Sequence, residues 1–202
     1  MNSRTYTARR SQRGVVLVSS LLLLIVVTII ALSMFRSFGI QEKIAGNMRE
    51  KQRALSAAVL AEEYAENWLD NGGNSSSASV VCSNLLNANV GQGQICSNKL
   101  PLAVTDLTNV PWTISGVPVG VSYLPLTMQV STTPSVTAAN LANPSYYATP
   151  TFYISDMGAS ADPTIPGEIY QIDAVGYGGN SNTVAEVEST YAVYTSSSNR
   201  TL

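Results

Sequence analysis

The feature that most constrains this chain is an apolar run near its N-terminus. Residues 15–35, from Val15 to Phe35, contain no charged side chain. As a helix rising about 1.5 Å per residue, this run would reach about 32 Å, enough to cross a bilayer core about 30 Å thick. Basic flanks stay in the cytoplasm, and four arginines precede the run: Arg4, Arg9, Arg10 and Arg13. We therefore expect a transmembrane segment at 15–35 and an exported chain from residue 36 onward.

Two kinds of removable export signal fit this run less well. A secretory signal has a shorter apolar region, about 7–15 residues, before a small-residue cleavage site. Ala31-Leu32-Ser33 imitates such a site, but the run before it is too long. Arg9-Arg10 resembles a twin-arginine signal, but polar Ser11 and Gln12 follow it and Arg13 intervenes.

The helical pattern continues beyond the membrane segment. No proline occurs between residues 15 and 70, and Gly39 and Gly46-Asn47 are the weak points. An apolar stripe recurs close to the 3.6-residue period, with Leu55 and Leu69 beside it: Ala54, Ala58, Ala61, Ala65 and Trp68. The stretch Asp70-Asn71-Gly72-Gly73 is a stop signal. We predict one helix whose amphipathic part, residues 36–71, covers a sheet.

The remaining residues, 72–202, are predicted to form an exported globular domain. Candidate strands are Val110–Ser115, Leu126–Val130 after Pro125, Thr151–Asp156, and the alternating segments EIYQIDAV and TVAEVESTYAVY joined by GYGGNSN. In these strands Asp and Glu are expected on the solvent face. The expected architecture is α+β, a long N-terminal helix packed on an antiparallel sheet.

Composition excludes several kinds of site. The chain has no His, so Ser-His-Asp and Cys-His catalysis are excluded and an enzyme is not expected. Its net charge of −2 gives no reason to expect a nucleic-acid partner. Cys82 and Cys96 are too few ligands for a metal site and are expected to pair as a disulfide in an oxidising compartment, with two free thiols as the alternative. No cofactor is expected.

Two further motifs are better explained as ordinary loops than as ligand-binding sites. The glycines of residues 176–179 could form a phosphate-binding loop, but without a following helix or Lys a hairpin turn is favoured. Asp156 and Asp162 flank a glycine-containing loop, but their spacing matches no EF-hand calcium loop.

The whole pattern resembles a type IV prepilin. The basic leader MNSRTYTARRSQRG ends in glycine and precedes an apolar helix, an amphipathic continuation and a sheet. The resemblance implies that prepilin peptidase cuts after Gly14 on the cytoplasmic side. The leader, 1–14, would be lost and Val15 would become a methylated N-terminus in the inner membrane.

Within this superfamily the chain resembles the PilX-type minor pilins of the type IV pilus. The match lies in QRGVVLVSSLLLLIVVTIIALSMF followed by QEKIAGNMREKQRALSAA, with support from TFYISDMG and YQIDAVGYGGNSNTVAEVESTYAVY. Residues 72–145 carry no such resemblance. The implied partners are other minor pilins, the major pilin, prepilin peptidase and a large PilY-type tip adhesin.

Two positions depart from the pattern of most major pilins. Those proteins begin the mature chain with Phe and carry Glu at its fifth position, where this chain has Val15 and Ser19. The family picture assigns that glutamate to the terminal amine of a neighbouring subunit inside the apolar filament core. A charge there costs at least ~2.5 kcal/mol unless it is paired. PilX-type pilins and K-type pseudopilins of type II secretion share the lack of this glutamate, which suits a subunit at the filament tip.

Three functions follow from these features. The first is a minor pilin in a priming or tip complex that initiates pilus assembly. The second is a K-type pseudopilin, although that group usually carries a larger inserted domain. The third is an adhesin module on a membrane stalk, for which residues 72–145 leave room.

The leader generates a prediction about processing. Mass spectrometry of membrane-extracted protein is expected to show a chain that starts at Val15 and carries an N-terminal methyl group. Gly14→Val is expected to block the cut, because its side chain crowds the scissile bond, while Gly39→Val leaves processing unchanged. A mature start near Met34, or an intact Met1, would contradict the prepilin interpretation.

Overall fold

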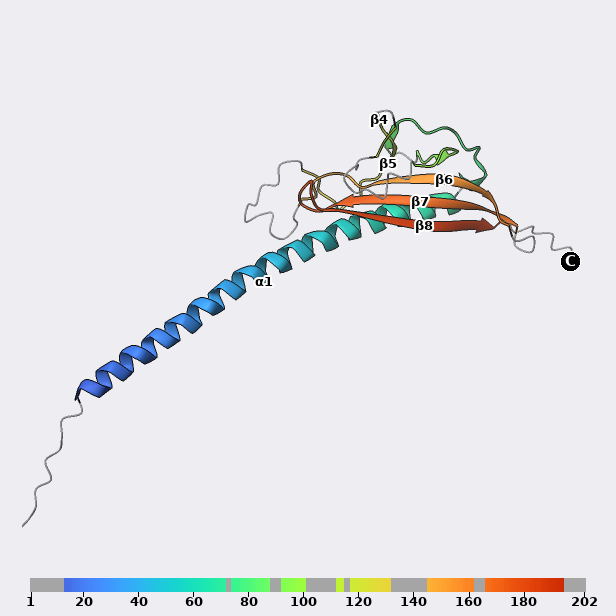
Figure 1. The fold of residues 1–202 in the computed structure, drawn as a ribbon. Helices are drawn as coiled ribbons and strands as arrows, with labels where there is room; N and C mark the ends of the chain where they lie inside the picture. Colours follow the sequence, from blue (N-terminus) through green and yellow to red (C-terminus); the bar gives the residue numbers. More distant parts are fainter. Residues whose placement is uncertain are drawn as a thin grey trace, which may run out of the picture. The chain divides into compact units, whose positions relative to one another are not determined.

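A single long helix begins the described part of the chain. The computed structural model describes residues 13–71, 74–87, 92–100, 112–114, 117–131, 145–161 and 166–194. Helix α1 (Arg13–Asp70, 58 residues) is continuous through Gly39 and Gly46 and ends at the predicted stop signal (Figure 1). The chain divides into two compact units, with the boundary inside α1 between Asn47 and Met48.

The second unit contains a mixed β-sheet. Its strand order is β1-β5-β6-β7-β8, with β2 beside β6. The bounds are β1 Leu85–Asn87, β2 Ile95–Cys96, β5 Gly120–Ser122, β6 Thr151–Ala159, β7 Gly167–Tyr177 and β8 Val184–Tyr194. A separate hairpin joins β3 (Thr113–Ile114) to β4 (Val117–Pro118), and a 3-10 turn, η1 (Asn74–Ser76), follows α1. The predicted α+β, pilin-like fold class is confirmed.

The expectation of a wholly antiparallel sheet is wrong at one side. β5, β6, β7 and β8 are antiparallel neighbours, but β1 runs parallel to β5 and β2 runs parallel to β6. β5 pairs with the first residues of β6, and β2 pairs with the next ones. β1 and β2 are three and two residues long, too short to produce a recognisable alternation in sequence.

The other strand predictions have mixed outcomes. The three predicted C-terminal strands are confirmed as β6, β7 and β8, and residues 178–183 form the connecting hairpin loop. Of the strand predicted at 110–115, Thr113–Ile114 is a strand and Trp112 precedes it. Residues 110, 111 and 115 lie outside the described residues. The strand predicted at Leu126–Val130 is wrong. The N–H of Met128 donates to the Pro125 carbonyl over 2.9 Å, which makes this segment a turn with Leu126 fully exposed.

The C-terminal part of α1 packs on one face of the sheet. The four alanines of the predicted apolar stripe are buried, whereas Trp68 is only half-buried. The helix residues with no exposed surface are Ala54, Ala57, Ala58, Ala61, Ala65 and Leu69. Opposite them lie the side chains of Phe152, Ile154, Ile172 and Ala174. The other face of the sheet buries Tyr153 and Val175 beneath Trp112, Val119 and the two cysteines. The sheet thus has a core on each face.

Gly176 in β7 is the point of closest approach between helix and sheet. A Cβ atom at this position would lie 2.4 Å from the carbonyl oxygen of Ala54 and 2.4 Å from the amide nitrogen of Ala58. These are backbone atoms, which cannot swing away as the end of a side chain can. The helix backbone therefore rests directly on the strand, which only glycine on one side and alanine on the other permit.

A polar cluster fixes the same end of the helix to the hairpin loop. The N–H of Gly179 donates to Glu50 Oε2 over 2.6 Å, and Arg53 forms an ion pair with Glu50 at 2.8 Å. Arg53 also donates to the Ser145 carbonyl at 2.9 Å and lies 4.6 Å from the ring centre of Tyr146. Partial burial raises the pKa of Glu50, but the bonds from Gly179 and Arg53 outweigh it and lower the pKa below its ordinary value.

The contact at Gly176 generates a stability prediction. Gly176→Ala is expected to destabilise the folded protein by about 1–3 kcal/mol, because the added methyl group overpacks backbone against backbone. The measurement is denaturant unfolding of the full-length protein in detergent, followed by the fluorescence of Trp68 and Trp112.

Gly46→Ala is the matched control for that prediction. No atom lies within 4 Å of a Cβ placed at Gly46, and alanine is favoured over glycine in a helix by ~1 kcal/mol. It should leave stability unchanged or slightly raised. Equal unfolding midpoints for the Gly176→Ala variant and the unmodified chain would refute the proposed close packing.

Candidate functional site

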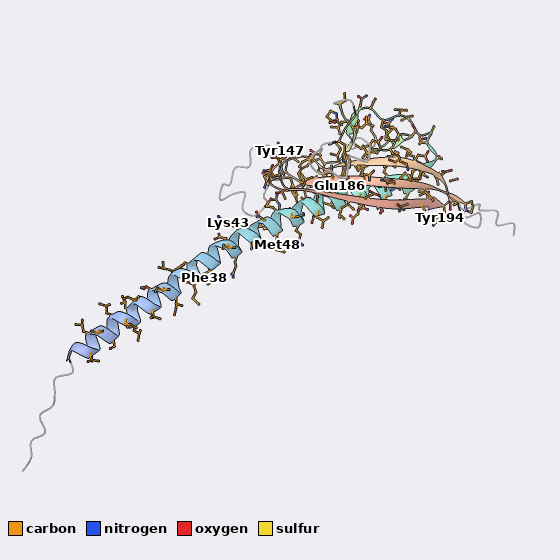
Figure 2. The ribbon with its side chains drawn as sticks, viewed as in Figure 1. Phe38, Lys43, Met48, Tyr147, Glu186 and Tyr194 are labelled. Carbon is orange, nitrogen blue, oxygen red and sulfur yellow. A yellow bond between two sulfur atoms is a disulfide. The ribbon has the colours of Figure 1, made fainter. Side chains whose placement is uncertain are left out.

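The apolar segment of α1 is exposed along its length. From Gly14 to Phe35 every described side chain is exposed except that of Ala31, which is half-buried; Phe35 is 73% exposed. By length and composition α1 is the one helix among the described residues that could span a membrane. Figure 2 shows the side chains of this segment projecting from the helix. So much apolar surface requires a cover of lipid or of other protein.

The few polar side chains in this segment are satisfied by the helix itself. Each hydroxyl donates to a carbonyl one turn earlier: Ser19 to Val16 at 3.0 Å, Ser20 to Leu17 at 2.9 Å, Thr28 to Ile25 at 2.8 Å and Ser33 to Ile29 at 2.9 Å. Such local bonds remove the cost of placing a hydroxyl in hydrocarbon. The segment is therefore compatible with a dry, apolar surrounding.

The predicted processing and assembly residues lie in the first turns of α1. Gly14 and Val15 follow the first helical residue, and no atom lies within 4 Å of a Cβ placed at Gly14. Ser19 stands four positions after Val15, on the same side of the helix. The first turn contains no acidic residue, so it has no carboxylate to complement the positive end of the helix dipole.

The predicted disulfide is present. Cys82 and Cys96 are bonded with a Cα–Cα distance of 5.4 Å, and both are buried. Because Cys96 belongs to β2, the bond ties the segment before β1 to the sheet. Asn98 supports it, accepting from the N–H of Cys82 at 2.7 Å and donating to the Cys82 carbonyl at 3.2 Å.

Neither the glycine-rich loop nor the loop after Asp156 shows a ligand site among the described residues. In the hairpin loop, the N–H of Gly178 donates to the Thr183 carbonyl at 2.8 Å, as in a turn. Asp156 accepts from the N–H of Gly158 at 2.8 Å, and Asp162 lies outside the described residues. No group of three acidic, His or Cys side chains that could hold a metal occurs among the described residues.

Asp173 corrects the expectation that strand carboxylates face solvent. It is only 3% exposed, opposite Tyr153 on β6 and Glu188 on β8. Burial raises the pKa of Asp173 to about 6; the nearby charge of Glu188 adds to this, while a 3.1 Å bond from Gln171 opposes it. Burial and the charges of Asp173 and Glu188 likewise raise the pKa of Glu186 to about 7. The outer face of β7 and β8 thus gathers three carboxyl groups.

The sequence did not predict the Glu50–Arg53 cluster or the burial of Asp173. The pairing of Glu50 and Arg53 had a local signal, since opposite charges three positions apart meet on a helix. Their bonds to Gly179 and Ser145 had none, because those partners are 129 and 92 positions away. The burial of Asp173 also had no signal, because alternation alone does not show that the outer face of β7 is covered.

The acidic face generates a prediction about pH. Raised carboxyl pKa values mean that the folded state binds more protons than the unfolded state, so stability falls as pH rises. The contribution is complete below about pH 4, where unfolded carboxyls are protonated, and is lost as pH passes the folded values of about 6 and 7. Denaturant midpoints of the full-length protein in detergent should therefore decrease from pH 5 to pH 8.

Asp173→Asn tests the cause of this dependence. It should flatten the profile and raise stability at pH 8 by roughly 1–3 kcal/mol, since a neutral amide avoids the buried charge. Glu42→Gln is the control, because Glu42 is exposed and lies in the first unit of the chain. An unchanged pH profile in Asp173→Asn would show that the dependence arises elsewhere.

Comparison with known proteins addresses the segment just described. Residues 13–58 match the family model described as PilX N-terminal. No curated protein and no solved structure matches the chain. The matched range covers the apolar segment, Ser19 and the start of the alanine stripe, but not the sheet. Over residues 13–58 the first part of α1 is therefore similar to the N-terminal segment of PilX-type minor pilins.

Proposed function

We propose that this chain is a minor pilin that initiates type IV pilus assembly in a priming or tip complex with other minor pilins and the major pilin. In this proposal the 15–35 segment anchors the precursor in the inner membrane. The leader lies in the cytoplasm, and residues 72–202 lie on the periplasmic side. Prepilin peptidase removes residues 1–14 after Gly14. The protein then leaves the membrane as the first subunit of a fibre.

The observation that carries the proposal is that the start of α1 has no carboxylate. Ser19 is bonded to its own backbone at 3.0 Å, and the first turn holds no acidic residue. A filament interior contains little water, so the amine at the start of a neighbouring helix needs a negative partner. A hydroxyl supplies no negative charge. This chain therefore cannot provide the pairing that a repeating subunit gives its neighbour.

The tip is the position where this lack costs least. A tip subunit has no subunit above it. It therefore has no neighbouring N-terminal amine to neutralise on that side. The exposed apolar segment still provides a surface for packing against the helices of subunits below. We assign the protein no catalytic reaction, because the chain has no His and its two cysteines are bonded to each other.

The prediction from this proposal concerns copy number and piliation. In sheared pili the protein should be far less abundant than the major pilin, measured by quantitative mass spectrometry against labelled peptides. Deletion should sharply reduce the number of pili, because initiation fails. Ser19→Ala should assemble normally, while Ser19→Glu should not improve assembly and is expected to impair it by leaving an unpaired carboxylate.

Three outcomes would contradict the tip-initiator role. The first is distribution along the fibre in amounts similar to the major pilin. The second is normal piliation after deletion. The third is normal piliation combined with loss of protein secretion, which would instead identify the chain as a pseudopilin of a type II secretion system.

A further inference from the structure

Strand β8 forms a long free edge of the sheet. Its eleven residues pair with β7 from Val184 to Tyr194, and it stands last in the strand order of the described residues (Figure 1). An edge strand turns alternate N–H and C=O groups away from the sheet. None of the backbone hydrogen bonds recorded outside the helix and strand ladders involves a residue from 184 to 194. Within the described residues, the outer side of β8 is therefore open to another strand.

This edge has only negative charges as protection against strand pairing. Natural edge strands are commonly blunted by Lys, by Pro or by a bulge. β8 contains neither Lys nor Pro, and its register with β7 is uninterrupted. Its charged residues are Glu186 and Glu188. Any strand that pairs here must tolerate, or exploit, negative charge.

Carboxyl groups lie on both sides of this edge. On the outer face Glu186 and Glu188 stand with Asp173 (Figure 2 labels Glu186). On the helix-facing side the Tyr191 hydroxyl donates to Asp70 Oδ2 at 2.6 Å. Glu66 lies close enough to Asp70, Glu62 and Glu63 for their charges, together with burial, to raise its pKa. Among the described residues the ion pair is that of Arg53 with Glu50, and none of these carboxylates forms one with a described Lys or Arg.

This charge distribution argues against a second copy of the chain as the occupant. In-register parallel pairing of β8 with β8 would place Glu186 and Glu188 of one copy opposite the same residues of the other. Full-length antiparallel pairing would still place the two Glu188 side chains diagonally across the strand pair. Like charges directly across a strand pair are destabilising. A strand with Lys or Arg would instead place its cations against the carboxylates on either face.

We propose that the free edge of β8 binds an extended, basic segment of another protein by strand addition. The main-chain hydrogen bonds provide the affinity, and the two acidic groups flanking the edge select a partner with Lys or Arg at alternate positions. The binding adds a strand beyond β8 and leaves the cores on both faces of the sheet unchanged.

The probe for this site is a synthetic peptide of about nine residues that alternates lysine with valine, matched to a typical strand length. Its fluorescein-labelled form is titrated with the full-length protein in neutral detergent, and anisotropy reports binding. Glu188→Lys should weaken binding by roughly tenfold, which corresponds to about 1.4 kcal/mol. Glu42→Lys makes the same charge change outside this unit and should leave binding unaltered.

Two modified peptides separate strand addition from ionic attraction alone. A peptide methylated on alternate backbone nitrogens keeps its charge but loses donors, and it should not bind. A peptide with Glu in place of Lys should not bind either. Equal binding by the methylated peptide, or no binding by the original, would overturn the proposal.

Cross-linking locates the bound peptide. The two natural cysteines are bonded to each other, so an introduced cysteine is the reactive thiol. Thr190→Cys on β8 should form a mixed disulfide with a peptide that carries one cysteine, while the equally exposed Thr127→Cys should not. Equal cross-linking of both would refute placement at β8. These readouts need no pili, so their failure would not count against the proposed role in assembly.

Discussion

The second unit, residues 48–202, depends on direct contact between the backbone of α1 and the sheet. At Gly176 the strand lies so close to Ala54 and Ala58 that even a methyl group would collide with helix backbone. Each residue of the stripe contributes little apolar area, but the short distance brings larger side chains such as Phe152 and Ile172 over the helix. The Glu50–Arg53 pair then holds the hairpin loop at the same end. Small residues and one ion pair thus position the sheet on the helix.

One helix has two environments because its residues change along its length. Up to Phe35 its side chains are apolar and exposed, and its hydroxyls bond to its own carbonyls. From Ala54 its apolar side chains are small and buried against the sheet. The first surface requires lipid or other subunits, whereas the second is satisfied within the chain.

The two faces of the sheet differ in polarity. The helix-facing side is covered by the alanine stripe, while the outer side buries Asp173 beside the disulfide-linked layer. A buried carboxyl group with a raised pKa reduces stability near neutral pH, a cost that apolar residues would avoid. The same carboxyl group adds to the acidic character of the β8 edge, to which we assign a binding role.

The sequence by itself determined α1, its end at Asp70 and the three long C-terminal strands. These features are local: they rest on periodicity, stop residues and alternation within a few residues. Tertiary structure alone decided that β1 runs parallel to β5 and β2 parallel to β6, that Asp173 is buried, and that the N–H of Gly179 donates to Glu50. Each of these depends on residues far apart in the chain, whose meeting no local pattern encodes. Gly176 belongs to both groups, because the sequence shows a glycine in a hairpin and only packing shows the helix that requires it.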